Sequence, residues 1–174
     1  MDVRSDKNFR FGNKNSPSKQ ETSTLQYWLL KSEPKTYSLA DLEHDREAIW
    51  DGVRNYQARN FLRQMQPGDP VFFYHSNTNP PGIVGLARVR QSGIVDPTQF
   101  DPSSPYYDPK STPNAPRWQT VEIEFDRAFP QMISLSTLKQ TFLPDQLWVV
   151  KRGNRLSVMP VPESIALQIL RQQD

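Results

Sequence analysis

The sequence predicts a small α+β domain in which a curved, mostly antiparallel sheet or open barrel is flanked by helices. Its 174 residues fit one domain. Sixteen prolines against seven glycines, with 11% aromatic residues, indicate many short elements joined by stiff loops rather than a helical bundle. About five or six strand patterns alternate irregularly with three or four helix patterns, which is too few helices for a doubly wound parallel sheet.

The chain divides near residue 25 into a polar tail and one folded domain. Residues 1–24 are rich in Asn, Ser and Lys and have no apolar period, so we expect a disordered tail. The folded domain is expected to span residues 25–174. It begins with a buried strand over Tyr27–Lys31, which Glu33 and Pro34 close.

Two helices are expected in the first half of the domain. Ser38 and Asp41 form a capping-box pattern ahead of a short helix over Leu39–His44. A second helix is predicted over Tyr56–Met65, and the turn at residues 67–69 ends it. Its apolar residues recur at helical spacing and are Ala58, Phe61, Leu62 and Met65.

The middle of the chain carries two strands and a long loop. Val71–His75 and Gly82–Gln91 have the pattern of strands, joined by a hairpin-like connection at residues 79–81. Residues 96–118 then contain six prolines together with Tyr106 and Tyr107. This composition predicts a long ordered loop or flap.

Strands and helices alternate in the last third. Val121–Phe125 is a period-two strand with its odd-numbered residues inward. Ser134 can cap a short helix that runs through Lys139. Two apolar segments follow at residues 147–150 and 156–158, and Pro162 is expected in the first turn of a final helix over Glu163–Arg171.

The composition excludes several classes of protein. Without cysteine there can be no disulfide, thiolate nucleophile or cysteine-ligated zinc, and a reducing intracellular setting is expected. No apolar run approaches the roughly 20 residues that span a bilayer, and the first 24 residues lack a signal-peptide core. We therefore expect a soluble protein without a membrane partner.

Charge is balanced outside the tail. Five of the 21 basic and three of the 19 acidic residues lie in residues 1–24, which leaves 16 of each in the rest of the chain. A balanced domain cannot rely on diffuse attraction to phosphates. Any binding of nucleic acid must therefore come from a local patch or a specific pocket.

The sequence contains no recognisable catalytic or metal-binding pattern. Its two histidines, His44 and His75, are about thirty residues apart, and no serine stands in a Gly-x-Ser-x-Gly elbow. The acidic residues between 41 and 47 fit no metal-ligand spacing and are expected to face solvent. We predict no catalytic residue, no metal and no cofactor.

The entrance to the second helix is the strongest candidate for a site. Asn55 is a good N-cap residue, but capping explains neither Trp50 nor Arg54. Free backbone N–H groups beside a flat ring and an arginine suit a planar polar ring or a phosphate. Polar residues also end two strands, and they are Lys31, Ser32, His75 and Ser76. Structural interpretations stay open, with Trp50 as a core anchor and His75 as a hydrogen-bonding residue.

Several motifs in order resemble the EVE domain family, from about Tyr27 to Leu170. They are Y-W-L-L-K-S-E-P at residues 27–34, W-D-G-V-R-N-Y-Q-A-R-N at 50–60, F-F-Y-H-S-N at 72–77, P-G-I-V-G-L at 81–86 and R-L-S-V at 155–158. D-P-T-Q-F-D and Y-Y-D-P-K in the proline-rich loop also match the family's pattern. The resemblance implies a PUA-like fold, a small mixed and mostly antiparallel pseudo-barrel flanked by helices.

The resemblance also implies a function, the reading of modified bases in DNA or RNA, particularly cytosines such as 5-methylcytosine and 5-hydroxymethylcytosine. Trp50 would stack on the base, Asn55 and Ser32 would read its polar edge, and Lys31 and Arg54 would hold a phosphate or carbonyl. The matching positions in this sequence are Lys31, Ser32, Trp50, Val53, Arg54, Asn55, His75 and Ser76, with Arg155 and Ser157 at the rim.

Two other functions stay open at this point. An enzyme acting on modified nucleotides would need His75, Asp51 or Glu33 as its acid or base. A small-metabolite sensor or a protein-interaction module would use the proline-rich loop with Tyr106 and Tyr107. For the reading of modified bases we expect a monomer whose partner is nucleic acid with modified bases. The short tail with five scattered basic residues favours a bacterial cytoplasmic protein, with a nuclear location expected only for a eukaryotic source.

Overall fold

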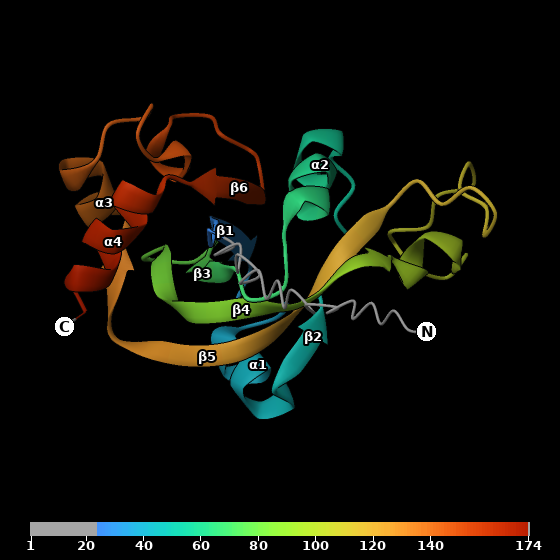
Figure 1. Ribbon diagram of the computed structural model, residues 1–174, viewed down its shortest axis with the longest axis horizontal. Coiled ribbons are helices and arrows are strands. Elements are labelled where there is room, and N and C mark those ends of the chain that lie inside the picture. Colours follow the sequence, from blue (N-terminus) through green and yellow to red (C-terminus); the bar gives the residue numbers. More distant parts are fainter. Residues whose placement is uncertain (1–23, 174) are drawn as a thin grey trace, which may run out of the picture.

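The computed structural model describes residues 24–173, which form one six-stranded open sheet flanked by helices (Figure 1). The strand order is β2-β5-β4-β3-β1-β6. β1 and β3 pair in parallel and every other pair is antiparallel, so the expected mostly antiparallel α+β fold is confirmed. The strands are β1 (Tyr27–Ser32), β2 (Glu47–Ile49), β3 (Pro70–His75), β4 (Gly82–Val95), β5 (Gln119–Ser134) and β6 (Val158–Val161).

The helices lie where the sequence predicts them. They are α1 (Leu39–Asp45), α2 (Tyr56–Gln64), α3 (Leu135–Thr141) and α4 (Glu163–Arg171). The capping box of Ser38 and Asp41 is present, and the Ser134 side chain accepts a hydrogen bond from the Thr137 N–H. Pro162 differs slightly from expectation, since it is the N-cap residue of α4 and not part of its first turn.

Three strands differ from the sequence prediction. β4 and β5 continue beyond Gln91 and Phe125, because bulges between the two strands break the period-two pattern that would reveal them. β2 was not predicted, since its three residues follow an acidic run, and it forms by pairing with Glu122–Glu124 of β5. The apolar segment at residues 147–150 contains a short 3₁₀ helix, Trp148–Val150.

Two further predictions concern the N-terminal tail and membrane-spanning segments. The polar tail expected at residues 1–24 lies, apart from Thr24, outside the described residues. Between residues 24 and 173, no helix is long and apolar enough to cross a membrane.

The sheet has an apolar core on each face. Because neighbouring residues of a strand point to opposite faces, Leu29 and Phe72 join one cluster, while Leu30 and Phe73 join the other. α3 and α4 contribute residues to the first cluster, and α1 and α2 to the second. β1 is buried on both faces, which explains its continuous apolar sequence.

A buried carboxylate fixes the end of α2 against β1. Asp69 is 3% exposed and accepts hydrogen bonds from the Trp28 indole N–H at 2.9 Å, from the Gln66 N–H at 2.9 Å and from the Gln26 N–H at 3.2 Å. These three donors satisfy the carboxylate away from water. They help to fix the position of α2, whose N-terminus borders the site described next.

Candidate functional site

A cavity of about 690 Å³ lies at the N-terminal end of α2. Residues 31–37 form part of its wall, residues 48–55 form another part, and Tyr106 and Ser157 complete it. Seven of the predicted site residues line this cavity, namely Lys31, Ser32, Trp50, Val53, Arg54, Asn55 and Ser157. The fold thus brings together the end of β1, the entrance to α2 and the segment before β6.

Trp50 is both a core anchor and a wall of the cavity. Its N–H donates to the Val121 carbonyl at 2.9 Å, and its own carbonyl accepts from the Thr120 hydroxyl. Its ring packs edge-to-face on Phe73, with centroids 5.6 Å apart and an interplanar angle of 84°. The half-buried indole is therefore held on one side by the core, while it also borders the cavity.

Arg54 is hydrogen-bonded to the proline-rich loop. Its Nε–H donates to the Tyr106 carbonyl at 2.8 Å, and its two terminal nitrogens donate to Asp96 and Thr98, each at 2.8 Å. One terminal nitrogen also donates to the Val53 carbonyl at 3.0 Å. Four of the five guanidinium N–H groups are thereby used. Arg54 therefore ties the loop to the cavity wall with four hydrogen bonds, and its holding of a phosphate or a carbonyl stays a prediction.

Asp96 is the buried centre of this connection. It is 1% exposed and, besides Arg54, accepts hydrogen bonds from the Gly52 N–H at 2.9 Å and the Thr98 N–H at 2.8 Å. Burial acts to raise the pKa of Asp96, but the hydrogen bonds from Arg54, Thr98 and Gly52 outweigh it and hold the pKa below its ordinary value. The carboxylate therefore stays charged and ties the loop to the cavity wall.

Gly52 allows the Tyr106 ring to close over the cavity wall. Its φ is +80°, a left-handed conformation that favours glycine. A Cβ at this position would lie 2.7 Å from a Tyr106 ring carbon. The glycine of the Trp-Asp-Gly-Val motif is thus required by the close approach of a loop more than fifty residues away.

Three polar side chains at the cavity each use part of their hydrogen-bonding capacity within the protein. The Lys31 Nζ donates to the Asn154 carbonyl at 3.4 Å, and burial lowers the pKa of Lys31. The Ser32 hydroxyl donates to the Tyr37 carbonyl at 2.6 Å, which leaves its oxygen as an acceptor. Asn55 accepts from the Ala58 N–H at 2.9 Å as a helix cap, and its amide NH₂ group has no such role.

The cavity also contains residues that sequence reasoning did not assign to the base-binding site. Asp51 lines it, and there desolvation raises the pKa of the carboxyl, Asp96 adds to this rise and Arg54 opposes it. Tyr37 lies in the wall and donates to Asp45 at 3.0 Å. Burial, followed by that hydrogen bond and the nearby acids, raises the pKa of Tyr37. The further lining residues are Glu33, Thr36, Ala48, Ile49, Gly52 and Tyr106.

The sequence indicates these additional lining residues with different strength. Tyr37 stands only three residues after Lys-Ser-Glu-Pro, so the same loop could have indicated it. Tyr106 stands in a family-like motif, but no local pattern places its ring beside Gly52. Ile49 belongs to the strand that the acidic run concealed.

His75 and Ser76 do not line the cavity, contrary to expectation. The His75 Nε2 accepts a hydrogen bond from the Leu39 N–H at 3.1 Å, so this ring caps the first turn of α1. The Ser76 N–H donates to the Ser32 carbonyl at 2.9 Å and continues the pairing of β3 with β1. A strand end can thus adjoin a pocket while its last side chains do not line it.

The capping role of His75 predicts a pH dependence of stability. Burial lowers the pKa of His75 from its ordinary 6.5, so the unfolded chain takes up the proton first. This contribution to the free energy of unfolding is complete above about pH 6.5 and is lost as the pH falls through the lower pKa of the folded state. Replacing His75 with Ala should lower the free energy of unfolding by about 1 kcal/mol at pH 7.

Urea denaturation at pH 7.5 and at pH 5 would measure this effect. The decrease in stability between the two pH values should become smaller in His75→Ala. The control is His44→Gln, at the exposed histidine in α1, which should retain it. An unchanged decrease in His75→Ala would contradict the capping role.

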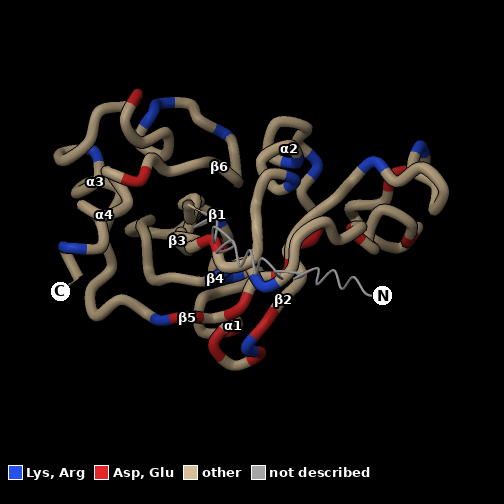
Figure 2. The backbone as a smooth tube through the Cα atoms, in the orientation of Figure 1, with Lys and Arg blue, Asp and Glu red and all other residues tan. Residues whose placement is uncertain are grey.

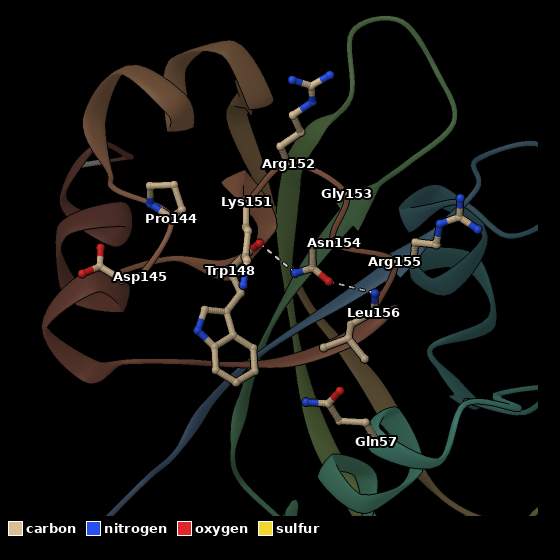
Figure 3. A pocket seen from close by; sticks show the side chains of 10 residues that line it. All are labelled: Gln57, Pro144, Asp145, Trp148, Lys151, Arg152, Gly153, Asn154, Arg155 and Leu156. Carbon is tan, nitrogen blue, oxygen red and sulfur yellow. Dashed lines mark hydrogen bonds between the residues drawn. The ribbon is translucent and has the colours of Figure 1, made fainter.

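Arg155 lines a second, neighbouring depression of about 630 Å³ (Figure 3). The loop of residues 151–156 forms one side of it and Gln57 of α2 contributes to another. The bond between the Lys31 ammonium and the Asn154 carbonyl connects this loop with the first cavity. Arg155 is therefore adjacent to the predicted pocket but outside it.

Comparisons with known proteins identify relatives over the whole described domain. The family model for the EVE domain matches residues 26–172. Thymocyte nuclear protein 1 of Mus musculus is 42% identical over 155 residues, which cover 79% of this chain and 69% of that protein. The Homo sapiens protein is 39% identical over the same length and coverage.

Solved structures agree with this relationship. A protein from Pseudomonas syringae is 46% identical with a TM-score of 0.81, covering 85% of this chain and 99% of that one. The human THYN1 protein, crystallised in complex with DNA that contains 5-methylcytosine, is 38% identical with a TM-score of 0.78, covering 86% and 98%. A YTH domain from Zygosaccharomyces rouxii is 15% identical with a TM-score of 0.52, which indicates a related fold.

Proposed function

Because this chain belongs to the EVE domain family, we propose that it is a binding module for a modified cytosine-type base in nucleic acid. The observation that carries the proposal is the cavity at the entrance to α2, with Trp50 in its wall. Its volume of about 690 Å³ falls in the range of ligand sites, roughly 300–1,000 Å³. A 38% identical human protein has been crystallised with 5-methylcytosine-containing DNA, which supports the same class of ligand here.

The lining offers each kind of contact that a modified cytosine needs. Trp50 supplies a ring on which the base stacks, and Val53 and Ile49 supply apolar contacts for a methyl group. The Lys31 ammonium and the Asn55 amide are donors for the ring nitrogen and carbonyl of the base. Glu33 and Asp51 are acceptors for its exocyclic amine.

The energetics favour moderate affinity. A base must leave the stack to enter the cavity, at a cost of a few kcal/mol, and one methyl group discriminates by only about 1–3 kcal/mol. Stacking on Trp50 contributes roughly 1–3 kcal/mol. We therefore expect micromolar dissociation constants for a single modified base, with a stronger preference only where a hydroxyl group is hydrogen-bonded.

Catalysis is not part of the proposal. His75, one of the candidate bases, is engaged by the Leu39 N–H and lies outside the cavity lining. Asp51 and Glu33 do line the cavity, so turnover of a modified nucleotide would favour the enzymatic alternative. The relatives come from bacteria and eukaryotes, and the location of this chain stays a prediction of the sequence.

Titration with matched oligonucleotides tests the proposal. Single- and double-stranded oligonucleotides carrying cytosine, 5-methylcytosine or 5-hydroxymethylcytosine would be followed by tryptophan fluorescence. We expect saturable quenching with about fivefold or greater preference for one modified base, as about 1 kcal/mol of discrimination implies. Equal affinity for all three bases would contradict the proposal.

A further inference from the structure

Charged side chains are segregated on this domain although their numbers balance. Figure 2 shows acidic residues along α1 and β2 and basic residues on α2. The acidic side includes Glu47 of β2 and Glu122 of β5, which both pair with Arg90. The arginines near α2 form two groups, one on and beside α2 and one on the loop before β6.

The first group is the cluster of Arg59, Arg63 and Arg117. The Arg59 guanidinium lies 4.7 Å from the centre of the Tyr56 ring, and one of its nitrogens donates to the Arg117 carbonyl at 2.9 Å. Arg117 donates to the Tyr56 hydroxyl at 2.7 Å. Desolvation lowers the pKa of Arg59, and the nearby charges of Arg63 and Arg117 lower it further. The domain thus holds three positive charges where they repel one another.

This cluster has little compensation by acids. Arg117 lies 3.5 Å from Asp108, whereas Arg63 donates to the neutral Gln119 side chain at 2.9 Å. Within residues 24–173, no carboxylate forms an ion pair with Arg59 or Arg63. Such an uncompensated cluster gives the surface a positive potential that suits an anion.

The cluster adjoins the cavity through a shared aromatic residue. Trp118 stacks on Tyr56, with ring centroids 4.9 Å apart. The Arg59 guanidinium lies 5.7 Å from the Trp118 ring centre, and that of Arg54, in the cavity wall, lies 5.2 Å from it. A nucleic-acid strand whose base occupies the cavity would therefore pass over this arginine cluster on one side of the cavity.

The second group consists of Arg152 and Arg155 on the loop before β6. Figure 3 shows both side chains extending outward from the loop around the second depression. Gln57 of α2 lines the same depression, and Trp148 in it packs on Phe61 of α2 with centroids 5.9 Å apart. The loop and α2 thus form one surface, with the depression between them.

We propose that Arg59, Arg63 and Arg117 on one side and Arg152 and Arg155 on the other form an arginine track that binds the phosphates flanking the extruded base. The inference rests on the proposed function, because the cavity, which both groups adjoin, defines where the nucleic-acid strand enters. Guanidinium groups suit phosphate, which they can bind through two parallel hydrogen bonds. The track supplies affinity without sequence information, while the cavity supplies the choice of base.

Single alanine substitutions at Arg63 and Arg155 test both sides of the track. Each should weaken binding of a 5-methylcytosine oligonucleotide about three- to tenfold at low salt. Each should also reduce the slope of log affinity against log salt by about 0.7–0.9. The ratio of affinities for modified and unmodified oligonucleotides should stay that of the unaltered protein, since neither residue lines the cavity.

Two controls accompany these variants. Arg171→Ala removes the same charge from an exposed site at the end of α4 and should change neither the affinity nor the salt slope. Arg63→Lys and Arg155→Lys keep the charge and should retain most of the salt slope. Thermal melting of each variant separates a loss of fold from a loss of contact.

The outcomes separate this inference from the proposed function. The track is overturned, and the modified-base pocket is left intact, if the proteins prefer the modified base but the affinity and salt slope are the same in Arg63→Ala, Arg155→Ala and Arg171→Ala. Salt-dependent binding that weakens in the two track variants, without base preference in any protein, would support the track and contradict the pocket. A loss of affinity in only one of the variants Arg63→Ala and Arg155→Ala would overturn the arrangement with arginines on two sides.

Discussion

Replacing Trp50 with alanine is expected to weaken binding of the preferred modified oligonucleotide by roughly 5- to 150-fold. The estimate is the loss of about 1–3 kcal/mol of stacking between a base and an aromatic ring. The preference for the modified base should fall as well, because the ring also confines the base against Val53 and Asn55. Fluorescence anisotropy of a labelled oligonucleotide measures both effects without depending on the removed tryptophan.

The same substitution removes a packing contact, so its effect on stability needs a control. Loss of the edge-to-face contact with Phe73 should lower the free energy of unfolding by about 2 kcal/mol. Tyr27→Ala is a matched control, since Tyr27 packs on Phe72 in the other core cluster and lines neither the cavity nor the second depression. Equal losses of binding in the two variants would show that stacking on Trp50 is not the cause.

Replacing Asp96 with alanine should produce the largest loss of stability, about 2–4 kcal/mol. The substitution leaves the Arg54 charge, with a side chain only 20% exposed, beside a cavity without its counter-ion. It also frees the N–H groups of Gly52 and Thr98. Because Arg54 holds the Tyr106 carbonyl, the loop should loosen and binding should weaken together with folding.

Acid titration distinguishes the charge of Asp96 from its shape. The pKa of Asp96 is held below its ordinary 3.8, so its contribution to stability is present above about pH 3.8 and is lost as the pH falls through the lower folded value. In Asp96→Asn the shape remains and the charge does not, so the decrease in stability over this acid range should be smaller. Urea denaturation from pH 7 to pH 3 measures it, and an unchanged decrease would contradict the role assigned to the carboxylate.

Local patterns were sufficient to predict most helices and strands. The spacing of Ala58, Phe61, Leu62 and Met65 predicted α2, and the Ser38–Asp41 pair predicted the start of α1. These signals are reliable because helical periodicity and capping depend on residues within a few positions of one another. β2 escaped prediction because a three-residue strand is stabilised by its pairing with β5 and not by its own sequence.

The sequence by itself also indicated most of the cavity wall near α2, since seven of the ten residues predicted to bind a ligand line the cavity; their binding of a ligand stays a prediction. Only the tertiary structure decided their roles. Arg54 binds the distant Asp96, His75 caps α1, and Tyr106 reaches Gly52 from the proline-rich loop. The physical reason is that a side chain's hydrogen bonds are made with whatever the fold brings within about 3 Å, often residues far away in the chain. A sequence shows which donors and acceptors exist, and the fold decides which of them remain available for a ligand.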